Sequence, residues 1–424
     1  MQKFFYLNFK TICSINLLSF KKHTVVVLGY FFIISLLGLL LRFFFVIPVN
    51  WNFEHLLHTH SHVSLLGWLF LGMSLIIYRV FLKGCGRRKT KNHIFLVFNI
   101  SFVGMLIAFP LQGYGLYSIA FSTLYLLTTY WFSWFTIKNI PEEIKDTFSW
   151  KLARMGLFYL VLSSFGTWAI GPISASAGTD SFWFNDALYF FLHFLYSGFF
   201  FLILISVLFR ILEKRKVRFS KDLQDKFYVY LNTGIFLSYF LSVIWKKPSL
   251  IFYFLGIIGA LYQIYGYFLF FKILQPHKKE FQKIFSKYSY FLLKLASALL
   301  IIRILMQLIS GFPYFAELAF EFKGFIIGYL HMVFLGILTP VLLVLMAHFK
   351  MLKFSGKNLN LFLFTFLITE FLIFYQAFAF WLKLPQSANH FKILAGFSCL
   401  FPIALGWLLF GNLKLAFSKK QEGL

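Results

Sequence analysis

Residues 24–47 read TVVVLGYFFIISLLGLLLRFFFVI, an apolar run in which Arg42 is the single charge. At 1.5 Å per residue, a helix of this length crosses the roughly 30 Å hydrocarbon core of a bilayer. A helix also satisfies its own backbone hydrogen bonds where no water can do so. Residues 1–23 carry lysines ahead of this run and no small-residue cleavage site, so we interpret the run as a retained span and not as a signal peptide.

Apolar blocks of about twenty residues recur along the whole chain, which has 424 residues, 60% of them hydrophobic and 13% charged. Strands of a membrane barrel would instead be about ten residues long with alternating polarity. We therefore predict an all-α, polytopic transmembrane bundle of about twelve helices, in a single domain over residues 24–414. The predicted spans are 24–47, 54–82, 94–111, 114–137, 149–172, 184–210, 227–245, 249–271, 288–311, 320–347, 359–382 and 392–414.

The net charge of +26 is distributed unevenly between the connections of these spans. Nearly all lysines and arginines fall on alternate connections, before the first span and after the last. By the positive-inside rule these connections, the N-terminal segment 1–23 and the tail 415–424 are cytoplasmic. The charge therefore indicates topology and contact with membrane lipid, and not nucleic-acid binding. Such a bias is typical of a bacterial inner (cytoplasmic) membrane protein.

The segment 51–68, WNFEHLLHTHSHVSLLGW, holds four of the eleven histidines of the protein. On a helix, His55, His58 and His62 share one face, because their spacing is i, i+3 and i+7, whereas His60 points away from it. Ionisable groups inside a membrane are costly unless they are paired, so a histidine cluster at the start of a span indicates function.

Two further histidines lie inside predicted spans, His193 in the sixth and His331 in the tenth. The second, sixth and tenth spans all enter the membrane from the outer side. His62, His193 and His331 each lie about nine or ten residues below that entry, roughly 14 Å deep by the helical rise. We therefore expect these three side chains to converge.

Neutral imidazole is a common metal ligand and a standard axial ligand of haem iron, and an apolar helical bundle suits the haem macrocycle. Haem propionates would need cations or donors near the outer surface. Arg303 of the ninth span, one turn before Gln307, and Arg42 of the first are the candidates. Tyr196 and the outer residues Glu317 and Glu321 could add hydrogen bonds.

This arrangement resembles subunit I of the haem–copper oxidase superfamily. The resemblance lies in the predicted count of twelve spans, in histidines on the second, sixth and tenth of them, and in HSHVSLLGW at residues 60–68. It implies that the second and tenth spans hold a low-spin haem, and that the sixth carries a copper ligand. It also implies electron transfer or handling of O2 or NO, with a redox partner or another respiratory subunit.

The chain departs from that family at its copper site. The seventh predicted span has no histidine pair, His193 is followed by Phe194 and Leu195 and not by Pro-Glu, and the tenth span has one histidine instead of two. We therefore expect a haem-binding protein without the standard copper centre. His62 and His331 are the expected axial ligands, and His193, His58 and His60 could orient a ligand or hold copper or another metal.

Two other functions fit the sequence. A proton-coupled or small-solute transporter could use the histidines and Glu370, which lies near the middle of the eleventh span, as relay groups. A non-haem membrane hydroxylase or desaturase would also use histidine clusters, but it places them on the cytoplasmic side, whereas this cluster faces outward.

Overall fold

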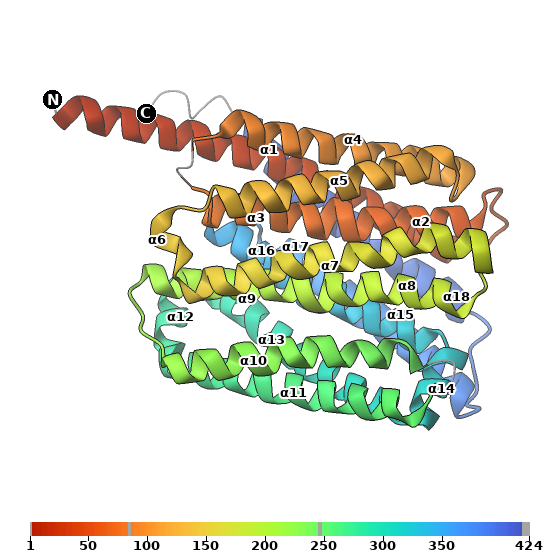
Figure 1. The fold of residues 1–424 in the computed structure, drawn as a ribbon. Helices are drawn as coiled ribbons and strands as arrows, with labels where there is room; N and C mark the ends of the chain where they lie inside the picture. The colour runs from red at the N-terminus through yellow and green to blue at the C-terminus, as the bar shows by residue number, and fades with distance from the viewer. Residues whose placement is uncertain (1, 84–85, 245–247, 418–424) are drawn as a thin grey trace.

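The computed structural model describes residues 2–83, 86–244 and 248–417, and these residues form helices and no strand (Figure 1). The predicted all-α class is therefore confirmed for the described chain. The last part of the predicted tail, residues 418–424, lies outside the described residues.

Most spans are single helices, but three of them change helix type partway along their length. The single helices are α1 (Gln2–Phe43), α4 (Arg88–Gln112), α5 (Leu116–Lys138), α7 (Phe148–Ala177), α10 (Lys221–Ser238), α11 (Leu250–Leu274), α13 (Lys287–Ser310) and α17 (Gly356–Trp381), with α18 (His390–Ser398) and α19 (Leu400–Phe417) forming the last span. The composite spans are α2 (Phe53–His62), η1 (Val63–Phe70) and α3 (Leu71–Val80); α8 (Phe182–His193), η2 (Phe194–Phe200) and α9 (Phe201–Lys214); and α15 (Gly324–His331), η6 (Met332–Leu338) and α16 (Thr339–His348).

Ten helices of the described chain are long and apolar enough to cross a membrane. Two of the twelve predicted spans fall outside this set, α5 and α10. Helix α5 carries seven serines and threonines along its length, and α10 begins with two lysines and two aspartates, so both are less apolar than their neighbours. The predicted connection between the ninth and tenth spans, together with residues 320–321, forms a separate short helix, α14 (Pro313–Glu321).

The three composite spans form the centre of the bundle. In their most apolar stretches 89%, 94% and 72% of the residues are buried, against 39–50% for the other seven candidate spans. The outer helices pack around them in three groups of four, with three outer spans to each inner span. The first group contains α4, α5, α7 and the α8–α9 span. The second contains α10, α11, α13 and the α15–α16 span, and the third contains α17, α18–α19, α1 and the α2–α3 span.

The two ends of the bundle differ in charge. The short helices α6 (Glu142–Lys145) and α12 (Lys278–Ile284), which belong to lysine-rich connections, lie at the end where α1 begins, and α14 lies at the opposite end (Figure 1). Helix α19 ends near the basic part of α1, since Lys22 lies 5.3 Å from the Phe417 ring centre. The alternating placement of basic connections predicted from the sequence therefore agrees with the structure.

A carboxylate at the basic end caps helix α7. Glu213 accepts hydrogen bonds from the Ser149 backbone N–H at 2.9 Å and from the Ser149 hydroxyl at 2.6 Å, and Arg210 lies 3.4 Å away. The Glu213 side chain is only 15% exposed. Its bonds therefore satisfy groups that water reaches poorly.

We expect Glu213→Ala to lower the free energy of unfolding in detergent by about 1–3 kcal/mol, because it leaves the helix start and Arg210 without their acceptor. Thermal and SDS-induced unfolding would measure the loss. The matched control is Glu142→Ala, since Glu142 is 86% exposed and pairs only with Lys145. That exposed pair is expected to contribute about 0–0.5 kcal/mol. Equal losses in both variants would contradict the capping role.

Candidate functional site

Each inner span repeats one short pattern, a histidine followed five residues later by a glycine. The three pairs are His62 and Gly67, His193 and Gly198, and His331 and Gly336. A π-helical segment begins directly after each of these histidines. Such segments are rare and concentrate at functional sites. This repeat is visible in the sequence, but apolar patterning alone did not point to it.

The glycines of the repeat have a packing role. A side chain at Gly67 would meet the ring of Tyr30, one at Gly198 the ring of Tyr159, and one at Gly336 the ring of Phe366. Each ring comes from an outer helix of the bundle. The repeat therefore places a close aromatic contact one to two turns inward of each histidine.

His60 of the second span and His331 of the tenth interact electrostatically. Arg42 of α1 is the other group that acts on the His331 ring. The Nδ1 of His60 lies 3.0 Å from the carbonyl oxygen of Ile34 on α1, and the ring stands over Gly38, where any side chain would collide with it. With Nδ1 held by a carbonyl, the Nε2 lone pair of His60 is free for a ligand.

A buried acid completes this cluster. Glu370 of α17 is 9% exposed, its Oε1 has no hydrogen-bond partner, and it interacts electrostatically with Arg42. His390, at the start of α18, is 6% exposed, and Arg42 also acts on it. We call Arg42, His60, His331, Glu370 and His390 the outer histidine cluster.

The other histidines of α2 occupy the opposite face of that helix, as the helical spacing predicted. His62 packs 4.4 Å from the Phe109 ring centre, and His58 packs 4.6 Å from that of Tyr114. His55 lies 3.4 Å from the carbonyl oxygen of Pro110. The Nδ1 of His62 bonds to the His58 carbonyl at 2.9 Å, which leaves its Nε2 free as well.

His193 is held on both sides of its ring. Its Nε2 lies 2.8 Å from the carbonyl oxygen of Ile235, and its Nδ1 lies 3.5 Å from the Ser242 hydroxyl. The side chain is 1% exposed. His193 therefore joins α8 to the end of α10, and neither of its nitrogens is left for a ligand in this arrangement.

The expected convergence of His62, His193 and His331 is thus not found in the structure. Each of these rings has its own neighbours: Phe109 for the first, Ile235 for the second, and His60 with Arg42 for the third. Among the described residues no group of three or more His, Cys, Asp or Glu side chains is placed to hold a metal ion. The spans share a depth, but their rotation about the helix axes turns the rings apart.

Arg303 belongs to a separate buried cluster. Its side chain is completely buried; Nη2 donates to the Ser197 hydroxyl at 2.7 Å and Nη1 to the Gln263 side-chain oxygen at 3.4 Å. The tyrosines that interact electrostatically with the guanidinium are Tyr196, Tyr267 and Tyr329. We call these residues, with Gln307, the Arg303 cluster.

The guanidinium of Arg303 has no charged partner among the described residues. The Phe201 ring centre lies 4.7 Å from its central carbon. A cation–π contact of this kind contributes up to about 2 kcal/mol when it is desolvated. Burial of an isolated ion costs several kcal/mol, so the ring alone does not offset the buried charge. Sequence reasoning assigned Arg303 to the histidines; in the structure it interacts electrostatically with His193 as well as with the three tyrosines.

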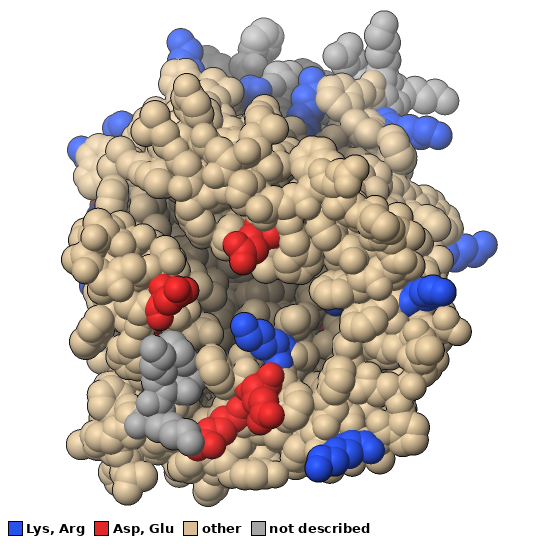
Figure 2. Space-filling view, turned by 90° about the vertical axis from the view of Figure 1, so that its right-hand side faces the viewer, with Lys and Arg blue, Asp and Glu red and all other residues tan. Residues whose placement is uncertain are grey.

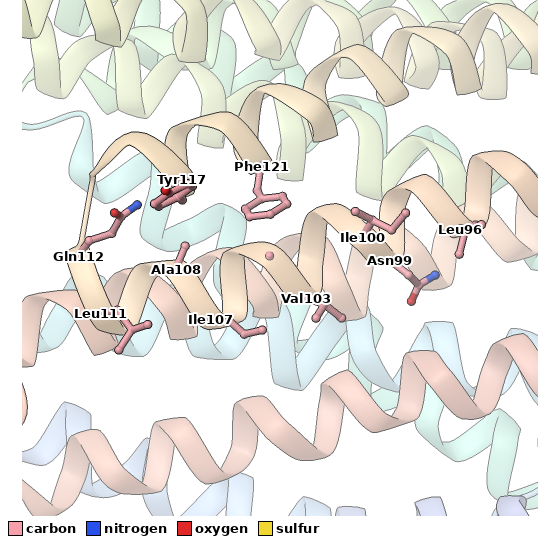
Figure 3. A pocket seen from close by; sticks show the side chains of 11 residues that line it. Leu96, Asn99, Ile100, Val103, Ile107, Ala108, Leu111, Gln112, Tyr117 and Phe121 are labelled. Atoms are coloured by element: carbon pink, nitrogen blue, oxygen red, sulfur yellow. The ribbon is translucent and has the colours of Figure 1, made fainter.

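The end of the bundle that carries α14 is hollowed at its centre, with both acidic and basic side chains around the hollow (Figure 2). Glu317 and Glu321 are exposed on α14, which lies at this end of the bundle (Figure 1). A second opening, of about 620 Å³, lies between α4 and α5 and has a mostly apolar lining (Figure 3). Its lining residues Ile107 and Leu111 are exposed on the outside of the bundle, which suits a lipid chain.

No model of a known protein family matches the chain, and no curated protein matches its sequence. The functional assignment therefore depends on the residues and their geometry. What the structure and the sequence establish together is a multi-pass, α-helical integral membrane protein with ten candidate spans.

Proposed function

We propose that this protein is a haem-binding membrane protein whose axial ligands are His60 and His331. The observation that carries the proposal is that His60 and His331, on two different inner spans, interact electrostatically with one another, while the Ile34 carbonyl holds Nδ1 of His60 and leaves its Nε2 for a ligand. His62, the ligand expected from the sequence, packs on Phe109 instead, so His60 takes its place in the proposal. The same resemblance to oxidase subunit I motivates the proposed role in electron transfer or in the handling of O2 or NO.

The residues around the two rings fit such a group. The carbonyl of Ile34 fixes the His60 tautomer, and Gly38 leaves room for the ring at its observed position. Arg42 supplies a cation for a propionate, and Glu370 and His390 each carry a buried polar atom without a hydrogen-bond partner. The Trp68 indole donates to the Thr339 hydroxyl at 2.9 Å and holds the two ligand-bearing spans together.

Haem bound here would supply reversible one-electron chemistry at its iron. The protein would contribute two neutral nitrogen ligands, a cation near the outer surface and an apolar surrounding that excludes water. With both axial positions filled by imidazole, the expected activity is electron transfer. Gas binding would require one imidazole to leave.

We further infer twelve membrane crossings, with α5 and α10 as the two beyond the ten candidates. Helix α5 has 23 residues and packs against α4, and α10 packs closely along α11. Both ends of the described chain then lie on one side, and the lysine-rich connections place that side in the cytoplasm. The proposed location is a bacterial inner membrane.

The reduced-minus-oxidised absorption spectrum of the detergent-purified protein tests the proposal. We expect sharp α and Soret bands, with about one haem per chain by pyridine haemochrome quantification. Expression must be carried out with ample haem so that an empty protein is informative. A featureless spectrum under those conditions would overturn the haem proposal.

A proton-coupled transporter is the second candidate, and Glu370 is the observation that favours it. Its carboxyl group is buried in the membrane interior beside Arg42 and leaves one oxygen without a partner. Uptake into proteoliposomes driven by a pH gradient, lost in Glu370→Gln, would support this function. It becomes the leading candidate only if haem is absent.

A further inference from the structure

We propose that the Arg303 cluster binds a small monovalent anion. The proposal does not depend on haem, because the outer histidine cluster and the Arg303 cluster share no residue. The residues that would contact the anion come from α13, from α11 and from the two inner spans that carry Ser197 and Tyr329. Helix α13 packs against both α11 and the span that contains η6.

The first argument concerns charge. Arginine keeps its proton in proteins, so a fully buried Arg303 carries a full positive charge. No carboxylate of the described chain forms an ion pair with it. Nη2 and Nη1 donate to Ser197 and Gln263, which are both neutral. A monovalent anion would balance the charge without leaving a surplus.

The second argument concerns hydrogen bonds. Arg303 Nε has no hydrogen-bond partner, which is unusual for a buried cation because buried polar groups are almost always paired. Tyr267 and Tyr329 lie within hydrogen-bonding reach of the guanidinium, so their oxygens can accept from Arg303 while their O–H groups donate to an anion. Gln307, one turn along α13, also has an unpaired buried oxygen.

The Nε edge of the guanidinium points to the kind of anion. Nη1 and Nη2 each use one of their two N–H groups on Gln263 and Ser197, whereas the N–H of Nε has no partner. The Nε edge therefore offers donors to a new acceptor. Guanidinium binds planar oxyanions through paired N–H groups, and a halide through a single point contact, so both kinds of anion are tested.

Anion-dependent stability of the full detergent-purified chain tests this proposal. Sodium chloride, formate and nitrite are titrated against sodium gluconate at constant ionic strength. We expect at least one of the three anions to raise the unfolding temperature by about a few degrees, in a saturable way. A response to chloride alone identifies a halide site, and a stronger response to formate or nitrite identifies an oxyanion site.

Matched variants separate the site from a general salt effect. Arg303→Gln should remove the dependence, whereas Arg154→Gln, at an exposed position of α7, should keep it. Tyr267→Phe and Tyr329→Phe keep the ring and remove one donor each, so they remain informative if Arg303→Gln does not fold. Each should weaken apparent affinity about tenfold. Identical unfolding temperatures in all four salts, or an unchanged dependence in both tyrosine variants, would overturn the proposal.

Discussion

Replacement of either His60 or His331 by alanine is expected to abolish the haem absorption bands of the purified protein. The two rings, on α2 and α15, interact electrostatically, and in the proposed site each would supply one nitrogen to the haem iron. With one ligand gone, bound haem should fall below about a tenth of the wild-type content, or shift to a five-coordinate spectrum. Reduced-minus-oxidised spectra and haem quantification on the variants measure both outcomes.

His62→Ala is the matched control, because it removes an imidazole only two residues from His60. Its ring packs against Phe109 on the other face of α2, so the haem spectrum should be unchanged. If His62→Ala lost haem and His60→Ala kept it, the pairing predicted from the sequence would hold, and our assignment of His60 would fail.

Gly259→Leu is expected to cause the largest loss of stability. Helices α10 and α11 approach so closely that a side chain at Gly259 would collide with the backbone of Leu237 and Ser238. At Gly234, on the other helix, a side chain would lie 2.7 Å from the Gln263 backbone nitrogen. Backbone atoms cannot rotate away, so the helices must separate. Small residues permit this kind of close packing in membranes.

We expect Gly259→Leu to cost about 3 kcal/mol or more, at the upper end of overpacking. The separation would also break the hydrogen bond from the Gln263 amide to the Ser238 hydroxyl. Gln263 is also the residue that accepts a hydrogen bond from Arg303. SDS-induced unfolding measures the loss. Gly411→Leu on α19 is the control, because nothing lies within 4 Å of a side chain there. Its expected effect is within about 0.5 kcal/mol, and an equal loss in both variants would refute the packing argument.

Much of the architecture was predictable from apolar block length. The second predicted span, 54–82, compares with the helical run Phe53–Val80, and the eleventh, 359–382, with Gly356–Trp381. Bilayer thickness fixes the length of an apolar helix, so such blocks are hard to misplace. Boundaries were weaker where polar residues continue a helix beyond the apolar block, as at Lys221 in α10. The short helix α14 was missed because its nine residues are too few to span a membrane, so the prediction treated most of them as a connection.

The candidate site was predictable only in part. Helical spacing correctly separated His60 from the face of His55, His58 and His62, because 100° per residue is fixed by the backbone. It could not tell which face of α2 meets the tenth span. That choice depends on how the α2–α3 span is rotated against its neighbours, and the contact of His60 with Ile34 and Gly38 of α1 sets this rotation.

The sequence by itself therefore determined that the chain is a helical membrane protein, which spans carry histidines and which connections are basic. These properties follow from local composition and from the thickness of the bilayer. Only the tertiary structure decided that His331 lies beside His60 and Arg42, and that Arg303 lies among tyrosines. Contacts between helices distant in sequence depend on the packing of whole surfaces, such as Gly259 against Ser238, and no local pattern encodes them.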